Sequence, residues 1–552
     1  MLPWAIKTPG QPIPGYGRLL GAVLAARGVE NPEGYLNPKE CGPLGNAGKA
    51  AFMLRSSRKV LIAGDYDCDG LCGAAILLRA LEKCRIPALV YIPERDEGYG
   101  FHKNAVDTAL SEECDLIITV DCGVSNQESI DYAVGKNIKV IVTDHHHFDQ
   151  PPKNCLLVHP KTHENPHLSG AGVAYKITRA MEFPEYPYVQ LAAIATMADA
   201  VQLTEGNRAL VCKGLTQTPI PGIQALLNVA GVDLTPETVC FQIAPRINAA
   251  SRMGTPLTAL HLLLLEEDDS SLAAELASQL DQLNTERKSV VEKAVKVCER
   301  QPVVMLDTPA GVIGIIAAKL ADELGVPATV ITPKGKGSAR APEGYSLVEM
   351  LKKCPSVLHY GGHDCAAGFK INPEKFDVFK SEFLKSCSVK PAYLKIDVPL
   401  GFVPSPEEVE ELEKIGPFGS GNPEPLFFYR GKANVKVYKK CSHVNVGPLK
   451  GVIFGKDASW YDGKKVAVVG TLHVSDYSGN AESFIQDIRP DVHINRKLLV
   501  HMYREMSHKK PIPETQSYKL ALKVFQELGI GSGSKKSLFS SKTYRRYALE
   551  RS

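Results

Sequence analysis

The sequence of 552 residues lacks the marks of a membrane protein and of a secreted one. It has no run of eighteen apolar residues, the length that a membrane-spanning helix needs, and its start, Met1-Leu2-Pro3-Trp4, does not begin a signal peptide. Its 14 cysteines include no Cys-x-x-Cys pair, which argues against a structural zinc site and favours reduced thiols. We therefore expect a cytoplasmic protein with no membrane partner.

The composition that is present is typical of globular domains, with 44% hydrophobic and 23% charged residues. A chain of this length exceeds what one hydrophobic core organises, so we expect several domains. The net charge of +3 hides an asymmetry, because residues 496–552 hold 13 Lys and Arg against 4 Asp and Glu, a charge of +9, and the remainder carries −6. Such a basic end can contact a polyanion, although a solvated helical surface is the commoner explanation.

The stretch KVLIAGDYDCDGLCG, residues 59–73, gives the first indication of a site. Its apolar run predicts a buried strand, and acids follow at alternating positions: Asp65, Asp67 and Asp69. Three carboxylates in five residues repel one another, so a bound cation is the simplest reason for their proximity. A solvated acidic turn is the alternative on this stretch alone.

After this stretch, strand-like runs alternate with helical ones, which predicts a parallel sheet covered by helices. The helices are expected over residues 74–84, 103–112 and 126–136. Two later strands also end in acid, at Asp121 and at Asp144, and ligands of open α/β sheets lie at such strand ends.

Histidines follow the last of these acids, in the run His145-His146-His147. Mixed histidine and aspartate ligation suits Mn²⁺ or a similar divalent ion. Farther on, Asp199 interrupts an apolar helical pattern at residues 191–200, where a core residue is expected. A buried carboxylate needs a partner, and a metal ion would be one.

Four segments resemble, in order and spacing, the motifs of the DHH phosphoesterases: GDYDCDG (64–70), TVDCG (119–123), TDHHH (143–147) and ATMADAV (195–201). Others are similar to segments of the bacterial RecJ family of single-strand-specific exonucleases: PERDEGYG (93–100), RINAASR (246–252), GGH (361–363) and GPFG (416–419). The resemblance covers about residues 50–490. It implies an α/β fold in which a parallel-sheet DHH catalytic domain is linked by a long helix to an α/β DHHA1 domain, followed by a β-barrel OB-fold domain and a small C-terminal helical region.

This resemblance divides the chain into six segments: an N-terminal lead-in (1–50) that packs on the first domain, a DHH catalytic domain (51–265), a connecting helix (266–300), a DHHA1 domain (301–390), an OB-fold nucleic-acid-binding domain (391–492) and a basic C-terminal helical region (493–552). The amphipathic pattern after Glu267 also predicts the connecting helix directly. Short strands separated by turns after residue 395 predict a small barrel. OB-folds bind single strands by stacking and a basic groove, and the candidates are Phe427, Phe428, Tyr429, Arg430, Lys439 and Lys440, of which alternate ones must face the barrel core.

The resemblance also assigns roles to residues. The implied metal ligands, for two Mn²⁺ or Mg²⁺ ions, are Asp65, Asp67, Asp69, Asp121, His145 and Asp199. The implied catalytic set is Asp67, Asp69, Asp121, His145, His146 and Asp199. Ala63 stands where some relatives carry histidine, so water or Asp65 would complete the shell of one ion. The implied substrate-binding residues, which would hold phosphates, are Arg95, Arg252, Ser338, Arg340, Gly361, Gly362 and His363.

The activity implied is that of a metal-dependent 5′-to-3′ exonuclease, which hydrolyses phosphodiester bonds of single-stranded DNA in recombination and repair. A helicase and a single-strand-binding protein stay open as partners. Two alternatives are a DHH-type phosphodiesterase acting on short oligonucleotides or cyclic dinucleotides, and a non-catalytic replication scaffold. The expected OB-fold and the chain length argue against the first, and the presence of every core acid argues against the second.

Overall fold

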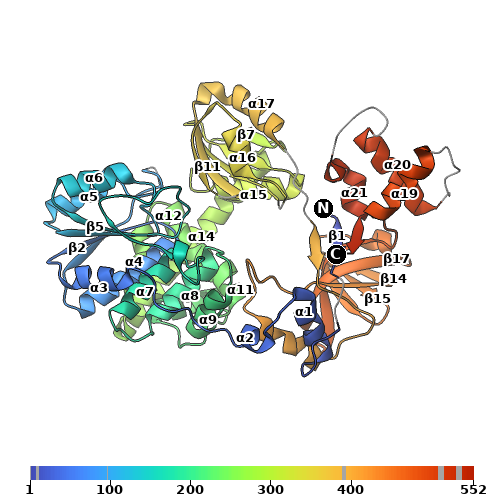
Figure 1. Cartoon of the computed structure of the whole chain (residues 1–552), viewed down its shortest axis with the longest axis horizontal. Coiled ribbons are helices and arrows are strands. Elements are labelled where there is room, and N and C mark those ends of the chain that lie inside the picture. The colour runs from blue at the N-terminus through green and yellow to red at the C-terminus, as the bar shows by residue number, and fades with distance from the viewer. Residues whose placement is uncertain are drawn as a thin grey trace.

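The computed structural model describes residues 2–7, 11–95, 97–342, 344–362, 364–387, 393–507, 515–529 and 537–551. Within them Figure 1 shows an α/β unit at one end, a smaller α/β unit reached by the long helix α14, and a barrel with attached helices at the other end. No helix of the described ranges has the length and apolar character needed to cross a membrane.

The first α/β unit is built on a five-stranded sheet with the order β3-β2-β4-β5-β6, and every neighbouring pair is parallel. Its strands are β2 (Val60–Gly64), β3 (Ala88–Tyr91), β4 (Leu116–Val120), β5 (Lys139–Thr143) and β6 (Leu156–Val158). Along β2, Val60 and Ile62 pack into one apolar cluster, whereas Leu61 and Ala63 pack into another on the opposite face. Helices cover both faces, as the predicted fold class requires.

Three connecting helices lie close to the predicted positions: α4 (Cys68–Lys83), α5 (Lys103–Ser111) and α6 (Gln127–Gly135). The first begins earlier than predicted because Asp67 caps it. The Asp67 Oδ1 accepts hydrogen bonds from the backbone N–H groups of Asp69, at 2.9 Å, and Gly70, at 3.1 Å.

A helical layer packs against one face of this sheet and continues into the long helix. Its members are α3 (Ala47–Arg55), α7 (Gly170–Ala180), α8 (Tyr188–Ala198), α9 (Glu205–Leu215), α10 (Pro221–Ala230), α11 (Pro236–Thr238), a π-helical turn (Val239–Ile243), α12 (Ala244–Arg252), α13 (Pro256–Leu264) and α14 (Ser270–Val297). The end of α14 packs on the smaller α/β unit through Val291 and Ala294. The long helix therefore joins the two α/β units, as predicted.

The smaller unit contains a second five-stranded sheet with the order β10-β11-β9-β8-β7. Only the β7–β8 pair of this sheet is parallel. Its elements are β7 (Val303–Met305), α15 (Ile313–Leu324), β8 (Ala328–Ile331), β9 (Lys336–Arg340), α16 (Leu347–Lys352), β10 (Val357–Gly362), β11 (Ala366–Ile371) and α17 (Phe376–Ser386).

The predicted barrel is confirmed, and it closes through pairing of its first long strand, β14, with β17. Its strands are β13 (Val398–Pro399), β14 (Phe427–Val437), β15 (Cys441–Val446), β16 (Lys450–Phe454), β17 (Lys465–Val474) and β18 (Ala481–Pro490). The expectation that Phe427, Phe428 or Tyr429 contacts nucleic acid is wrong, because all three are buried. Phe427 and Tyr429 fill the barrel core, and the ring of Trp4 covers Phe428 on the outside, with ring centroids 6.1 Å apart.

The lead-in divides between two units. Residues 40–50 lie on the first domain, as expected, since Leu44 and Ala47 pack into its core and Glu40 pairs with Lys176, whereas the first strand and the first helix do not. The strand β1 (Trp4–Ile6) pairs in parallel with β12 (Leu394–Ile396) on one side and β19 (Leu549–Arg551) on the other. The helix α1 (Arg18–Arg27) packs into the core of the barrel. The reason is that the apolar side chains of both elements find their partners in the barrel and not in the catalytic layer.

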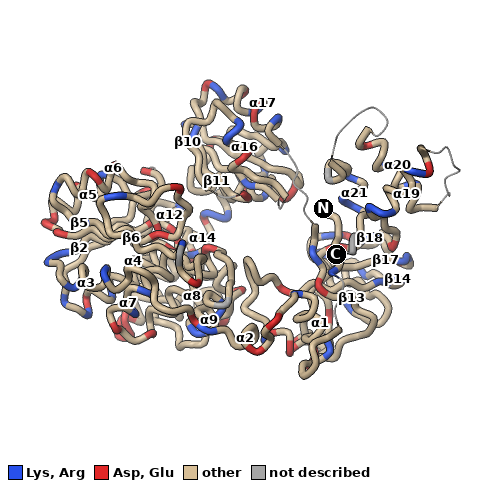
Figure 2. Tube along the Cα trace, in the orientation of Figure 1, with Lys and Arg blue, Asp and Glu red and all other residues tan. Residues whose placement is uncertain are grey.

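The C-terminal helices α19 (Arg496–Ser507), α20 (Gln516–Leu528) and α21 (Lys542–Tyr547) share a small core of their own. Lys and Arg gather on α19 and α21 in Figure 2. The segment of residues 530–536, which contains the run GSGS, lies outside the described ranges.

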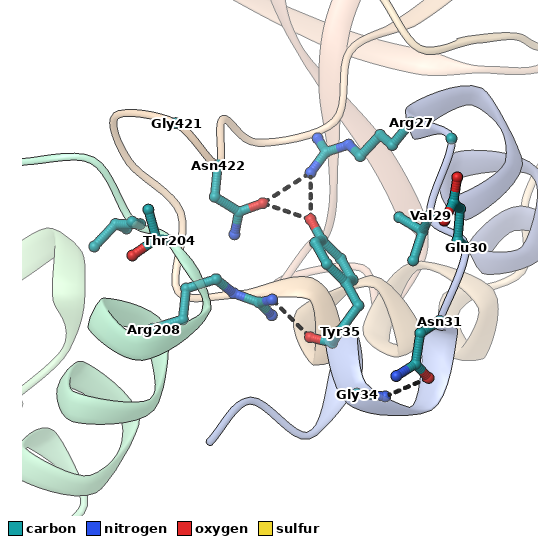
Figure 3. A pocket seen from close by; sticks show the side chains of 12 residues that line it. Arg27, Val29, Glu30, Asn31, Gly34, Tyr35, Thr204, Arg208, Gly421 and Asn422 are labelled. Carbon is teal, nitrogen blue, oxygen red and sulfur yellow. Dashed lines mark hydrogen bonds between the residues drawn. The ribbon is translucent and has the colours of Figure 1, made fainter. Parts of the chain in front are cut away.

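Helix α2 (Pro32–Leu36), helix α9 and the loop before the barrel meet around a cavity of about 400 Å³ (Figure 3). The buried Arg208 of α9 donates hydrogen bonds to the carbonyl oxygens of Tyr35, at 2.6 Å, and Ile415, at 2.7 Å. Arg27 donates to the side-chain oxygen of Asn422 at 3.0 Å. These polar contacts join the barrel to the catalytic layer.

Candidate metal centre

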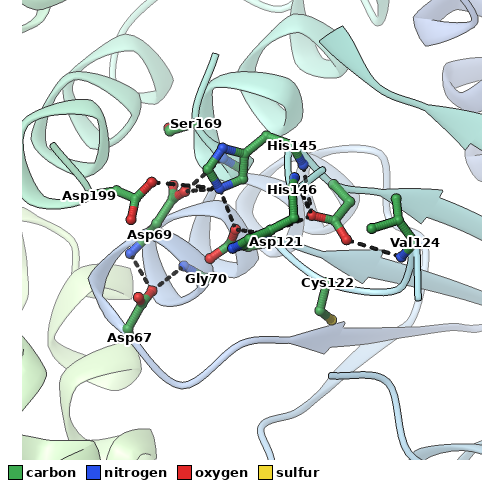
Figure 4. A network of polar contacts seen from close by, with 12 residues as sticks. Asp67, Asp69, Gly70, Asp121, Cys122, Val124, His145, His146, Ser169 and Asp199 are labelled. Atoms are coloured by element: carbon green, nitrogen blue, oxygen red, sulfur yellow. Dashed lines mark hydrogen bonds and ion pairs between the residues drawn. The ribbon is translucent and has the colours of Figure 1, made fainter. Parts of the chain in front are cut away.

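Acidic and imidazole side chains from four parts of the chain converge at the carboxyl edge of the first sheet (Figure 4). Asp65, Asp67 and Asp69 follow β2, and Asp121 follows β4. The histidines follow β5, and Asp199 lies at the end of α8. The parallel order of the strands explains this convergence, because their carboxyl ends meet at one edge.

The acid cluster after β2 is fixed by backbone contacts. Asp67 caps α4, and Gly70 lies so close to Asp65 that a Cβ on it would be 2.4 Å from the Asp65 carbonyl oxygen. One oxygen of the buried Asp65 carboxylate accepts no hydrogen bond from the described residues. Burial and the neighbouring Asp67 raise the pKa of Asp65 well above its ordinary value.

Asp69 is held by the start of a helix that lies a hundred residues away in the sequence. Its two oxygens accept hydrogen bonds from the N–H groups of Gly170, at 2.7 Å, and Ala171, at 2.8 Å, in the first turn of α7. Burial and Asp67 raise the pKa of Asp69 to about 6, although these two amides oppose the rise. The helix terminus thus fixes the direction of the carboxylate.

Asp121 lies at the middle of the cluster. Its backbone has a positive φ of 60°, and the His145 Nε2 lies 3.1 Å from its Oδ1. The same nitrogen is 3.7 Å from Asp69 Oδ2 and 3.6 Å from Asp199 Oδ2. Burial and the other carboxylates raise the pKa of Asp121 and that of Asp199 well above the ordinary value.

Asp144 and His146 form a separate pair beside this cluster. The fully buried Asp144 carboxylate accepts hydrogen bonds from the backbone N–H groups of Val124, His145 and His146, and its Oδ1 is 2.9 Å from His146 Nδ1. Burial lowers the pKa of His146, but Asp144 outweighs this effect and raises the pKa to about 9. The oxygens of Asp144 are therefore already engaged in hydrogen bonds, and this carboxylate fixes the position of His146.

The cluster fits divalent metal ions by its donor chemistry. Three sets have ligand atoms within 4.8 Å of one another: Asp65, Asp67 and Asp121; Asp69, His145 and Asp199; and Asp121, His145 and His146. Asp65 and Asp121 each keep a buried oxygen that accepts no hydrogen bond from the described residues. Buried carboxylates that repel one another are stabilised by a cation, and oxygen with imidazole donors suits Mn²⁺ or Mg²⁺.

The predicted phosphate contacts lie where the two α/β units approach each other. Arg95 donates to the Ser251 hydroxyl, and Lys336 of β9 donates to the Arg95 carbonyl oxygen at 2.6 Å. Burial and the positive charge of Arg95 lower the pKa of Arg252 to about 9. Crowded, buried guanidinium groups favour a bound anion.

The remaining predicted contacts belong to the smaller unit. Arg340 donates to the Ser338 hydroxyl at 3.0 Å, and both side chains lie within 3.2 Å of the position that a Cβ on Gly314 would take. Gly361 is paired with Gly368, which is paired with Ser338, so Gly361 and Gly362 extend the same strip of sheet. His363 lies outside the described residues.

The sequence reasoning assigned no role to Tyr99, Gly170 and Asn248. The Tyr99 hydroxyl donates to the Asp121 carbonyl oxygen and lies 2.9 Å from His146 Nδ1. A Cβ on Gly170 would lie 2.5 Å from the Asp121 Cβ, and the Asn248 side chain accepts a hydrogen bond from the Cys68 N–H. A serine followed by small residues at 169–172 is a helix-start signal that the sequence reasoning overlooked.

Family models match the chain in three places. They are the DHH family N-terminal domain at residues 59–200, the DHHA1 domain at 295–388 and the RecJ OB domain at 397–486. The matches occur in the order that the motifs predict.

Individual relatives agree. The single-stranded-DNA-specific exonuclease RecJ of Haemophilus influenzae is 30% identical over 480 residues, which cover 74% of this chain and 82% of the relative. The protein of the same name from Thermus thermophilus is 35% identical over 435 residues, 73% of this chain, but the chain spans only 64% of that relative. The crystal structure of RecJ from Thermus thermophilus in complex with Mn²⁺ superposes with a TM-score of 0.78 at 25% identity and covers 98% of both chains.

Proposed function

The chain belongs to the RecJ family of DHH proteins, and we propose that it is a metal-dependent exonuclease that degrades single-stranded DNA from its 5′ end in recombination and repair. The observation that carries the proposal is the convergence of carboxylate and imidazole side chains in one cluster, whose members are Asp65, Asp67, Asp69, Asp121, His145 and Asp199. The proposal includes a cytoplasmic location, and a helicase and a single-strand-binding protein stay candidate partners. The proposal also includes the division of the chain into the six segments that the sequence predicts.

Two ions are proposed for this cluster. Asp65, Asp67 and Asp121 would hold one, and Asp69, His145 and Asp199 would hold the other, with Asp121 shared. When bound, a pair of divalent ions supplies a hydroxide nucleophile at neutral pH and neutralises charge on the leaving oxygen.

The protein's own residues position the substrate and a proton. Asp144 raises the pKa of His146 and so favours the imidazolium, which would donate a proton or a hydrogen bond to the phosphate region. Arg95, Arg252 and Arg340 would bind phosphate oxygens with forked hydrogen bonds, and Ser338 would add a hydroxyl donor. Asp69 keeps its direction through the amides of α7, which requires no reorganisation during the reaction.

The test is digestion of 5′-labelled and 3′-labelled single strands and duplexes with Mn²⁺ or Mg²⁺. We expect cleavage of the single strands alone, with mononucleotides released first from the 5′ end. Asp121→Asn should abolish turnover and leave oligonucleotide binding largely intact. Asp149→Asn is the matched control, since the Asp149 side chain lies only four residues after His145 but is 98% exposed.

Two outcomes contradict the proposal. Unaltered turnover by the Asp121→Asn variant would contradict the assignment of Asp121 as a metal ligand. A preference for dinucleotides or cyclic dinucleotides over long strands would replace the exonuclease with a small-substrate phosphodiesterase.

A further inference from the structure

Phe241 is an exposed aromatic side chain of the catalytic layer that lies in an unusual backbone element. Phe241 is 70% exposed, although the residues on either side of its turn, Val239 and Ile243, are fully buried. It lies in the π-helical turn Val239–Ile243 that leads directly into α12. Single-turn π-helices are rare and occur frequently at functional sites. Among the described residues of the π-turn, Phe241 is thus the one that projects furthest into solvent.

The position of Phe241 along the helix points to the candidate active site. Phe241, Pro245, Asn248 and Arg252 follow one another at intervals of four, three and four residues, the spacing of one helix face. Asn248 of this face holds the N–H of Cys68, between Asp67 and Asp69, and Arg252 is a predicted phosphate contact. Arg246, which does not share the spacing, pairs with Asp281 of α14. The face that carries Phe241 is therefore the face that adjoins the metal centre.

The neighbours of Phe241 place the π-turn beside the helix that carries Asp199. The Cys240 thiol donates a hydrogen bond to the carbonyl oxygen of Met197, at 3.4 Å, and Met197 precedes Asp199 by two residues. The turn thus lies against the end of α8, the helix that delivers Asp199. No residue of the turn belongs to the ligand sets of the metal centre among the described residues.

The same part of the molecule faces the barrel. Figure 1 places α11, which precedes the π-turn, on the side of the catalytic unit toward the barrel. Burial raises the pKa of Glu424, in the segment that enters the barrel, and the nearby Glu237 of α11 raises it further. A strand of nucleic acid that runs from the barrel to the metal centre would pass this edge.

We propose that Phe241 stacks on a nucleobase of the single strand near the cleavage site and so positions the strand. This inference rests on the proposed function. Every nucleobase offers a flat face to an aromatic ring, so such a contact tolerates all sequences. The ring of Phe241 is available for this contact because it is not engaged in the core, and its place on the helix face of Asn248 and Arg252 distinguishes it from other exposed rings.

The experiment compares Phe241→Ala with Phe52→Ala, the matched control. Phe52 lies on α3 and is 73% exposed, so both variants remove an exposed ring from the same unit. We expect Phe241→Ala to raise the KM for an oligothymidylate of about fifteen nucleotides by about 5- to 160-fold, the range of one base–aromatic stack. The KM of this variant for a dinucleotide should rise much less, so the ratio of the dinucleotide KM to the long-strand KM should fall. The Phe241→Trp variant, which keeps an aromatic ring, should have a KM for the long strand within about threefold of that of the original protein.

A second readout follows binding directly. Trp460 is replaced by Phe, because it is 59% exposed, and Trp4 is retained because it is buried. In this background the fluorescence of Phe241→Trp should be quenched by saturating oligothymidylate. The inference is overturned if Phe241→Ala behaves like Phe52→Ala, if both KM values rise equally, or if the fluorescence stays constant. If the unmodified protein cleaves neither substrate, the proposed function fails instead.

Discussion

The contact between Gly170 and Asp121 allows a precise test of how the metal centre is built. The substitution is Gly170→Ala, which leaves every proposed ligand in place. The new Cβ would lie 2.5 Å from the Asp121 Cβ and 2.9 Å from its Cα. Carbon atoms pack at about 3.5–4.0 Å, so α7 and Asp121 must separate by about 1 Å.

This separation acts on two proposed ligands together. Asp121 already has a positive φ of 60°, so its backbone has little freedom to yield. The Gly170 N–H also donates to Asp69 at 2.7 Å, and a displaced α7 would lengthen that bond. A misplacement of about 1 Å costs on the order of 100-fold in rate, so we expect kcat to fall by about that factor and Mn²⁺ affinity to weaken.

Gly172→Ala provides the control within the same helix. Its Cβ would lie 3.4 Å from the nearest atom, a side-chain carbon of Leu168, which is an ordinary contact. Alanine favours a helix over glycine by about 1 kcal/mol, so this variant should be as stable as the original or more so. Both are assayed for turnover of a 5′-labelled single strand across Mn²⁺ concentrations, with circular dichroism to verify folding. Equal kcat values for the two folded variants would refute the reasoning.

Three further predictions concern stability. Added Mn²⁺ should raise the thermal unfolding midpoint, because at a concentration of 100 Kd it stabilises the folded state by about 2.7 kcal/mol. The Asp121→Asn variant should lose most of this stabilisation. An equal rise of the midpoint in the variant would contradict the prediction. Burial raises the pKa of Glu40, but Lys176 and Lys213 outweigh this and leave it below the ordinary value. Its stabilisation is therefore present above the ordinary glutamate pKa and lost as pH falls through the folded-state pKa. Glu40→Gln should cost about 1–3 kcal/mol at neutral pH, and urea unfolding should show the difference shrinking in acid; a constant difference would be inconsistent with it. Trp4→Ala should cost about 3–5 kcal/mol and increase hydrogen exchange in both β12 and β19, and an increase in one strand alone would argue against the shared pairing.

The sequence was sufficient for the sheet and for the positions of its acids. Alternating apolar runs predict the strands, because Val60 and Ile62 must be buried on one face and Leu61 and Ala63 on the other. Acids placed directly after parallel strands must meet at one edge of the sheet, whatever the conformation of the connecting loops. These inferences need only local patterns and the geometry of parallel sheets.

The parts that were missed depend on contacts between residues far apart in the sequence. Nothing near Asp69 indicates that Gly170 will hold it, and nothing near Phe428 indicates that Trp4 will cover its outer face. For the same reason the first strand and the first helix of the lead-in were placed on the wrong unit. The side chains of β1 alternate between two faces, as in any strand, so the sequence pattern alone does not identify the sheet that β1 joins.

The supporting contacts also explain why the acid cluster can exist in a folded chain. Mutual repulsion and burial oppose ionisation of Asp65, Asp121 and Asp199, as their raised pKa values indicate. The fold holds the neighbouring Asp67 and Asp69 with the backbone amides of α4 and α7. Among the described residues no lysine or arginine forms an ion pair with the carboxylates of the cluster, whose ion-pair partners are histidines. A permanent basic partner would neutralise the acids and occupy the oxygens that a cation needs. Amide donors fix the carboxylates in place and leave their net charge available, which is the arrangement that a centre for divalent ions requires.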